Sequence, residues 1–327
     1  MENHETKITR GYFDIQTETD VPIKKIPFIE AESGVPGPVV WITAGVHGDE
    51  VGGVAVVQEL CKRFQQNPLR IGAVKTFPLL NPLGFEAGMR HIPELEEDLN
   101  RAFPGKRNGT PAEQIAEKIF STVVDSKPSI VLDLHNDWKI SIPYALVDPE
   151  PDTSLGREAF VKIHEVGKTV GLLTIQEQDE EKEISETTLS GALLRQGVPS
   201  ATFELGESHI VNEEHVRDGV LAVWNVLAYF ELVRPEQEPE MHFKIPASYQ
   251  GKVFHYSDRP RSTVGGLARY TLQSGAEVKK GDPVAYIYDV FGTLKETLYA
   301  ESRGIILGYS DRAVVSPGDS VVALGVF

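Results

Sequence analysis

The chain has 327 residues, of which 41% are hydrophobic and 24% are charged, a balance typical of a globular protein with a sizeable core. Its 48 acidic and 32 basic residues give a formal net charge of −16, which argues against a nucleic-acid partner because phosphate backbones bind basic surfaces. The single cysteine, Cys61, excludes an intrachain disulfide framework and a thiolate metal cluster.

The first residues of the chain and its most apolar stretch both bear on localisation. Residues 1–13 contain no apolar signal core. The longest apolar stretch, residues 220–233, is interrupted by Asn225 and is too short to cross a bilayer. We therefore expect a cytoplasmic protein with no membrane partner.

Apolar strands and amphipathic helices alternate through the first 233 residues. After two or three antiparallel strands within residues 7–32, further strands are predicted at residues 37–45, 71–80, 129–135, 143–148 and 199–206. Helices are predicted at residues 50–66, 110–126, 154–171 and 212–233. This alternation predicts an α/β sheet covered by helices on both faces, with functional residues at the carboxyl ends of its strands.

Two of these helices have clear start signals. Thr110, Pro111 and Glu113 have the spacing of a capping box with proline at the first helical position. Asn212 is expected to cap the last helix. Residues 81–109, between the predicted strand at 71–80 and the predicted helix at 110–126, lack a regular pattern. An irregular segment of that length is usually functional or disordered.

The composition changes after a Pro- and Glu-rich linker at residues 234–246. The remainder shows no convincing helix, and "VKKGDPVAYI" at 278–287 resembles "VSPGDSVVAL" at 315–324. Two similar strand–turn–strand units predict a small β-barrel or sandwich. We therefore divide the chain into residues 1–236 and a β-rich domain of residues 237–327 that covers or shapes the mouth of the site.

The segment "ITAGVHGDEVGG", residues 42–53, places His47 and Glu50 in a glycine-rich turn between a strand and a helix. His135 ends another strand, in "DLHND". Two histidines and one glutamate are a known ligand set for hydrolytic zinc. Each also has a structural interpretation, since an acid such as Glu50 favours a helix start without any metal. Asp133 would face the same side as His135 and could orient its imidazole.

Four further residues suggest substrate contacts and proton transfer. Asn100 and Arg101, in "DLNRAFPG" at residues 98–105, can hold a carboxylate. Arg90, which precedes this segment, can stabilise negative charge on a carbonyl oxygen. Glu204, in "FELGE", ends an apolar strand, where a carboxyl with a raised pKa can act as general base and then as general acid. The structural alternatives are solvated arginines and a buried glutamate paired with arginine.

The motifs "GVHGDE", "DLNRAFPG", "DLHND" and "FELG", in this order, resemble the succinylglutamate desuccinylase/aspartoacylase family, which is related to the zinc carboxypeptidases. The resemblance covers nearly the whole chain, and the last quarter is similar to the family's C-terminal β-domain. It implies a carboxypeptidase-like α/β/α fold with a mixed sheet, a small C-terminal all-β domain of barrel-sandwich type, and one Zn²⁺ per chain.

The resemblance also implies the residues of the reaction centre. The implied metal ligands are His47, Glu50 and His135. Glu204 would be the catalytic acid and base, and Arg90 would polarise the substrate carbonyl.

Substrate binding is implied at further positions. Asn100 and Arg101 would grip a substrate carboxylate, and Arg195 is a further candidate contact. A tyrosine of the C-terminal domain could reach the substrate, the candidates being Tyr270, Tyr286 and Tyr288.

These features together predict a zinc-dependent amidohydrolase that removes an acyl group from an N-acyl amino acid or a related carboxylated amide. Its partner would be a small anionic substrate, and a homo-oligomer would be in keeping with many metabolic enzymes. One alternative is a metallocarboxypeptidase that acts on short peptides. Another is a non-catalytic binding or regulatory protein that retains the fold.

Overall fold

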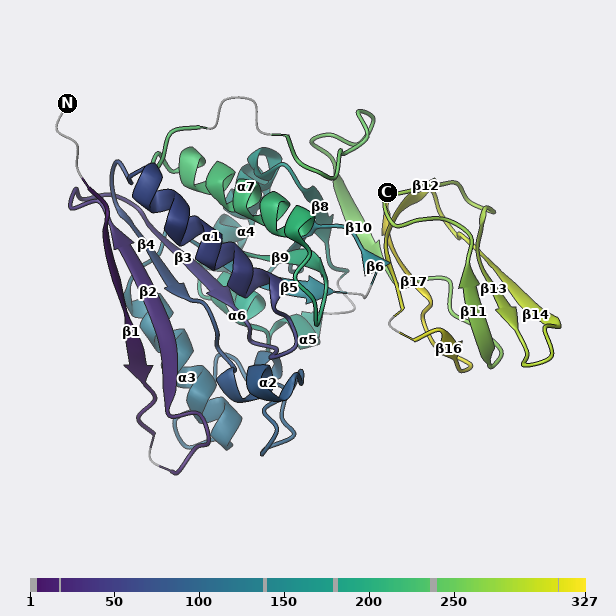
Figure 1. The fold of residues 1–327 in the computed structure, drawn as a ribbon, viewed down its shortest axis with the longest axis horizontal. Coiled ribbons are helices and arrows are strands. Elements are labelled where there is room, and N and C mark those ends of the chain that lie inside the picture. Colours follow the sequence, from purple (N-terminus) through teal and green to yellow (C-terminus); the bar gives the residue numbers. More distant parts are fainter. Residues whose placement is uncertain (1–4, 18, 138–139, 179–181, 236–239, 311) are drawn as a thin grey trace.

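A computed structural model describes residues 5–17, 19–137, 140–178, 182–235, 240–310 and 312–327. Its main feature is a 13-stranded mixed sheet that begins at the N-terminal strands and continues into the C-terminal region. A separate four-stranded antiparallel sheet forms the far end of the molecule, at the right of Figure 1. The predicted α/β architecture with a C-terminal all-β part is confirmed.

The strands before residue 235 run through the larger lobe in Figure 1. They are β1 (Lys7–Asp14), β2 (Lys25–Glu32), β3 (Val39–Ala44), β4 (Ala73–Phe77), β5 (Ile130–Asp137), β6 (Ile140–Ser141), β7 (Tyr144–Val147), β8 (Leu173–Gln176) and β9 (Ser200–Glu207). The helices are α1 (Gly52–Gln66), α2 (Pro82–Ala87), the 3₁₀ helix η1 (Leu99–Arg101), α3 (Pro111–Asp125), α4 (Ser154–Val170), α5 (Lys182–Ser185), α6 (Leu189–Arg195) and α7 (Glu213–Tyr229).

Helices cover both faces of this sheet, as the alternating pattern predicts. Buried side chains of α1, α4 and α7 pack on one face, whereas those of α3 and α6 pack on the other. The parallel core runs β4, β3, β5 and β9, and β7 then joins β9 in the antiparallel direction. The carboxyl ends of β3, β5 and β9 therefore meet at one edge, where the loops after them can form a site.

The local start signals act as predicted. The Thr110 side-chain oxygen accepts a hydrogen bond from the backbone N–H of Glu113, and the Glu113 carboxylate accepts one from the backbone N–H of Thr110, which completes the capping box of α3. Asn212 caps α7. The irregular segment at 81–109 differs from the expectation, since it contains α2, capped by Asn81, and the single turn η1. Both helices are too short to show a periodic apolar pattern.

The C-terminal strands divide between the two sheets. They are β10 (Val253–Ser257), β11 (Gly266–Tyr270), β12 (Glu277–Val278), β13 (Pro283–Tyr288), β14 (Leu294–Tyr299), β15 (Gly304–Tyr309), β16 (Val314–Val315) and β17 (Val322–Val326). The two similar sequence segments become β12 with β13 and β16 with β17. The second sheet has the order β14-β13-β11-β16.

The C-terminal region is joined to the rest by strand pairing. β10 pairs parallel with β8 and antiparallel with β17, and β15 pairs with β6. Apolar side chains pack together at this junction, where Ile175 of β8, Phe254 of β10 and Ile305 of β15 belong to one buried cluster. Across the part of the chain described, no helix is long and apolar enough to cross a membrane.

Candidate active site and metal centre

His47 and Glu50 lie in the turn between β3 and α1, and both side chains are buried. Gly45 adopts a positive φ of 60°, a conformation that favours glycine. A Cβ on Gly48 would lie 1.9 Å from the carbonyl carbon of Gly84, so the turn packs directly on the backbone of α2. The glycines therefore allow the tight fold that brings the two side chains together.

Glu50 lies between two imidazoles. Its Oε1 is 2.6 Å from Nδ1 of His47, and its Oε2 is 2.9 Å from Nδ1 of His135, which comes from β5. One ligand atom from each of the three residues lies within 4.8 Å of the others. Two imidazoles and a carboxylate suit Zn²⁺, so the residues present fit the implied ion.

The charges of these groups depend on one another. Burial alone would raise the pKa of Glu50, but His47 and His135 together hold it well below its usual range. Burial would lower the pKa of His135, whereas the carboxylates of Asp133 and Glu50 raise it well above its usual value. Both shifts reflect negative charge gathered around the imidazoles, and a bound cation would balance that charge in place of a proton, since ligating histidines are neutral.

A carboxylate holds the outer nitrogen of each histidine. Nε2 of His47 is 3.1 Å from Oδ1 of Asp98, and Nε2 of His135 is 3.0 Å from Oδ2 of Asp133. Thr43 in turn donates a hydrogen bond to Asp133. Such partners fix the orientation of ligating imidazoles. The sequence analysis anticipated Asp133 but missed Asp98, although Asp98 is the first residue of "DLNR".

Asn136 is a second residue that the sequence analysis missed. Its backbone N–H donates to Oε2 of Glu50 at 3.0 Å, and its side-chain oxygen accepts from the amide of Gly52. Its side-chain amide donates to the carbonyl oxygens of Leu205 and Glu207. Asn136 therefore connects β5 and β9 to the start of α1 around the carboxylate of Glu50.

Glu204 lies on β9 directly beside His135, to which it is paired in register. Its Oε2 atom is buried and has no hydrogen-bond partner among the described residues. Burial raises the pKa of Glu204 well above its usual value, with a further increase from Asp137 and a partial offset from His135. A carboxyl in this condition can accept a proton and later release it.

Tyr144 flanks Glu204 on the other side, because β7 pairs with β9 so that the two residues are opposite one another. The Tyr144 hydroxyl donates a hydrogen bond to Asp137. Burial, followed by the charge of Asp137, raises the pKa of Tyr144 well above its usual value. The phenol is thus a neutral donor next to the candidate proton-transfer group.

The four other predicted site residues have different surroundings. Arg90 contacts Asp98 at 3.1 Å and Glu50 at 3.4 Å, at the edge of the histidine cluster. Arg101 donates to the backbone oxygen of Asn100, whose side-chain oxygen accepts from the amide of Leu189. Asn100 therefore ties η1 to the start of α6.

Arg195 is not brought together with the other predicted site residues. It ends α6, forms an ion pair with Glu186 and does not line the cavity that holds the other predicted residues. Tyr270, which stacks on Tyr309, does not line that cavity either. The spacing of residues in the C-terminal sequence does not specify the register of the strands, and register decides which side chains of a strand point into a cavity.

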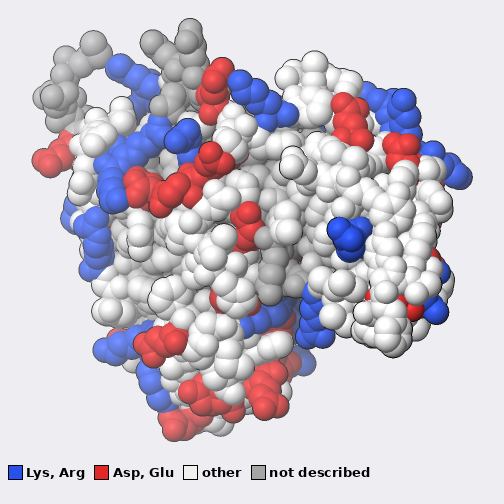
Figure 2. All heavy atoms as spheres, turned by 45° about the vertical axis from the view of Figure 1, so that its right-hand side comes forward, with Lys and Arg blue, Asp and Glu red and all other residues white. Residues whose placement is uncertain are grey.

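A cavity of about 610 Å³ connects these groups. Its lining includes the cluster of His47, Glu50 and His135, together with Glu204, Arg90, Asn100 and Arg101. The C-terminal region contributes further lining residues, which are Tyr256, Ser257, Asp258, Arg259, Arg261 and Ser320. Of the tyrosines in this region, Tyr256 lines the cavity, whereas the predicted candidates Tyr286 and Tyr288 do not. On the face shown in Figure 2, acidic and basic side chains are interspersed.

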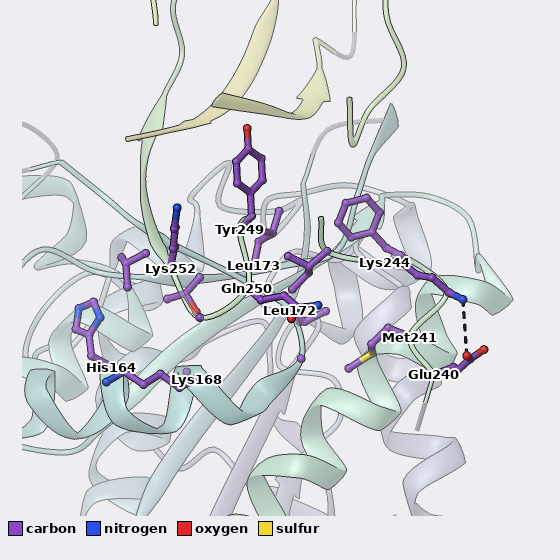
Figure 3. A pocket seen from close by; sticks show the side chains of 17 residues that line it. His164, Lys168, Leu172, Leu173, Glu240, Met241, Lys244, Tyr249, Gln250 and Lys252 are labelled. Atoms are coloured by element: carbon purple, nitrogen blue, oxygen red, sulfur yellow. Dashed lines mark ion pairs between the residues drawn. The ribbon is translucent and has the colours of Figure 1, made fainter. Parts of the chain in front are cut away.

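A second cavity, of about 460 Å³, lies between the end of α4, the start of β8 and the segment that leads to β10 (Figure 3). Lys168 and Lys252 lie at its left in the figure, and an ion pair joins Lys244 to Glu240. None of the predicted site residues lines this cavity.

Comparisons with known proteins identify the family of the chain. The model of the succinylglutamate desuccinylase/aspartoacylase catalytic domain matches residues 36–230. The N-alpha-acetyl-L-2,4-diaminobutyric acid deacetylase of Halomonas elongata is 27% identical over 296 residues, which are 88% of this chain and 82% of that protein.

Solved structures share the whole fold. An aspartoacylase family protein from Mesorhizobium loti aligns with a TM-score of 0.78 at 22% identity, over 97% of this chain and 94% of that one. The product-bound ectoine utilization protein EutE (DoeB) from Ruegeria pomeroyi gives 0.77 at 20% identity, over 100% of both chains. Likeness at this identity concerns the fold, so function is argued from the site.

Proposed function

Because the chain belongs to the succinylglutamate desuccinylase/aspartoacylase family, we propose that it hydrolyses the amide bond of an N-acyl amino acid with the help of one Zn²⁺ ion. The observation that supports the proposal is that one cavity contains both a set of possible metal ligands and a carboxyl suited to proton transfer. The cluster of His47, Glu50 and His135 lies there beside Glu204, whose Oε2 atom is buried and has no hydrogen-bond partner among the described residues.

The three ligands proposed for zinc are His47, Glu50 and His135. Bound zinc would supply a Lewis acid that polarises the amide carbonyl and lowers the pKa of a water molecule. The protein's part is to keep both imidazoles oriented through Asp98 and Asp133.

Glu204 is proposed to move the protons. Its raised pKa suits a group that takes a proton from the attacking water and transfers it to the departing amine. Arg90, at the edge of the cluster, is proposed to stabilise the negative charge that develops on the carbonyl oxygen. Asn100 and Arg101, both in the cavity lining, are proposed to bind the substrate carboxylate.

The first substrates to test follow from the relatives. The Halomonas elongata protein is a deacetylase of N-alpha-acetyl-L-2,4-diaminobutyric acid, and other relatives, from Shewanella species, are succinylglutamate desuccinylases. Acetyl and succinyl amino acids are therefore the primary candidates. The mixed acidic and basic lining of the cavity suits a small zwitterionic amino-acid product.

The test is release of free amine by zinc-loaded protein from a panel of N-acetyl, N-succinyl and N-formyl amino acids and short peptides. We expect release from one acyl class and at least a 100-fold lower kcat for Glu204→Gln, which removes the proton acceptor but keeps the shape. Metal content by mass spectrometry should show one zinc per chain, and chelation should abolish turnover.

Other results would decide between the alternatives. Release from peptides alone would identify a metallocarboxypeptidase. Full activity of Glu204→Gln would refute the assigned acid and base. Protein that binds no zinc and releases no amine would support a non-catalytic role for the fold.

A further inference from the structure

The active-site cavity extends well beyond the reaction centre along β7 and β9. Glu204 and Thr202 are two residues apart on β9 and face the same side, and Tyr144 and Leu146 of β7 are opposite them in register. Asp148 continues the same alternation past the end of β7, and all five side chains line the cavity. Asp148 is four positions after Tyr144, which corresponds to about 13 Å along a strand.

The part of this cavity around Asp148 is polar, and neither lysine nor arginine is among the hydrogen-bond and ion-pair partners of this acid in the described residues. We call this part the cavity floor, and its residues are Asp148, Thr188, Ser190 and Thr202. Thr202 donates a hydrogen bond to Ser190 at 3.2 Å, and Thr188 donates to Oδ1 of Asp148 at 3.4 Å. Hydroxyl groups, rather than lysine or arginine, therefore surround the carboxyl of Asp148.

Asp148 is a buried acid that the proposed reaction does not use. Its side chain is only 5% exposed, and Ser185 donates a second hydrogen bond to Oδ1 at 2.6 Å. None of the ion pairs among the described residues includes Asp148. Burial raises its pKa, although the neighbouring hydroxyls counteract this effect. A carboxylate that faces a cavity without a counter-charge is costly unless a ligand supplies the charge.

The arginines of the cavity are engaged elsewhere. Arg90 contacts Asp98, and Arg101 donates to a backbone oxygen of η1. Arg259 and Arg261 both contact Asp258 in the C-terminal region. The contacts of these arginines are thus with Asp98, Asp258 and the backbone of η1, whereas the floor presents an acid.

We propose that the cavity floor binds the side chain of the substrate amino acid and that Asp148 accepts its terminal ammonium group. The inference rests on the proposed function and narrows the substrates to N-acyl diamino acids. With the amide at Glu204 and the α-carboxylate at Arg101, a side chain of a few methylene groups would extend towards the floor. The same acid would disfavour an anionic side chain such as that of aspartate.

A purely structural role for Asp148 is the competing explanation. Its carboxyl lies close to the start of α6, where a Cβ on Gly191 would be 2.8 Å from Oδ1. The variant Asp148→Asn separates the two roles. The amide oxygen can still accept from Ser185 and Thr188, whereas the charge that would pair with an ammonium group is lost.

The experiment compares two substrates of nearly equal shape, N-alpha-acetyl-2,4-diaminobutyrate and N-acetylnorvaline, which has a methyl group in place of the ammonium. For the unmodified protein we expect kcat/KM to be about 100-fold higher with the diamino acid. In Asp148→Asn this ratio should fall to near one, with the norvaline rate kept, because a desolvated ammonium loses its charge partner. Asp152→Asn, an exposed acid paired with Lys182 outside this cavity, should keep the original ratio.

Binding of the free amino acids, measured by calorimetry, tests the floor without catalysis. The unmodified protein should bind 2,4-diaminobutyrate at least 10-fold more tightly than norvaline, and Asp148→Asn should not. Equal binding of the two amino acids, or an equal loss with both in Asp148→Asn, would overturn the assignment of Asp148. Selective binding without hydrolysis of any acyl substrate would retain the floor and refute only the proposed function.

Discussion

At the scale of single residues, the cavity contains acids whose charged form is disfavoured by burial in the folded chain. Glu204 is the clearest case, since burial and Asp137 both raise its pKa. An acid whose pKa is higher in the folded state than in the unfolded state loses stability as pH rises from the unfolded value, near 4.3, through the folded value. The charged form of Glu204 therefore destabilises the metal-free protein at neutral pH.

Replacing Glu204 with glutamine should relieve this cost. We expect the metal-free Glu204→Gln variant to melt at a higher temperature than the unmodified protein at pH 7, with a difference that vanishes near pH 4. Thermal unfolding followed by circular dichroism across this pH range checks the prediction. Glu158→Gln, on the exposed face of α4, serves as the control. A lower melting temperature for Glu204→Gln at pH 7 would show that the carboxylate contributes to stability.

Asp98 should matter for metal binding although it is not a proposed ligand. It contacts both Nε2 of His47 and the guanidinium of Arg90. In Asp98→Asn we expect zinc affinity to fall about 10- to 100-fold, because the imidazole loses the carboxylate that orients it. Competition with a chromogenic chelator measures the affinity, and Asp125→Asn, an exposed residue at the end of α3, is the control. Unchanged affinity would mean that backbone geometry alone orients His47.

At the scale of elements, the turn between β3 and α1 packs so closely on α2 that position 48 has no room for a side chain. A Cβ at position 48 would come within 2.2 Å of the amide nitrogen of Phe85 as well as meeting Gly84. Backbone atoms cannot move aside as a flexible side chain can, so Gly48→Ala should cost about 1–3 kcal/mol of unfolding free energy. It should also weaken zinc binding, since His47 is the adjacent residue.

Urea unfolding of the metal-free protein, together with a zinc titration, checks this prediction. The matched control is Gly265→Ala, where the nearest atom to a new Cβ is the carbonyl oxygen of Val315 at an ordinary 3.6 Å. Equal stability of the two variants would show that α2 can move away from the turn without cost.

The elements also show which features a sequence can predict. The capping box of Thr110 and Glu113 spans three residues, and the apolar patterns of β3, β5 and β9 are local. The contact between Asp98 and His47 joins residues 51 positions apart, and the bond between Asn136 and Glu50 joins residues 86 apart. Such pairs depend on strand order and register, which local patterns do not specify. For the same reason, neither the position of Arg195 nor the cavity-lining Tyr256 could be predicted.

At the scale of the whole molecule, strand pairing crosses the proposed boundary between residues 236 and 237. β10 adds to β8 at the sheet edge, and β17 and β15 extend the same sheet. The C-terminal region also lines the cavity of the candidate active site through Tyr256 and Arg261. The change in composition at the linker therefore marks a change of architecture, but the hydrogen bonds of the main sheet continue past it.

This continuity predicts one unfolding event for the whole chain. Separating the regions would expose the edge of β8 and the apolar cluster of Ile175, Phe254 and Ile305, and an open apolar edge favours aggregation. Scanning calorimetry should therefore show a single transition, with equal calorimetric and van't Hoff enthalpies. A chain that ends at Arg234 should be insoluble or lack a cooperative transition. Two transitions in the full chain, or a soluble and cooperatively folded truncated chain, would show that the sheet joins two independently stable domains.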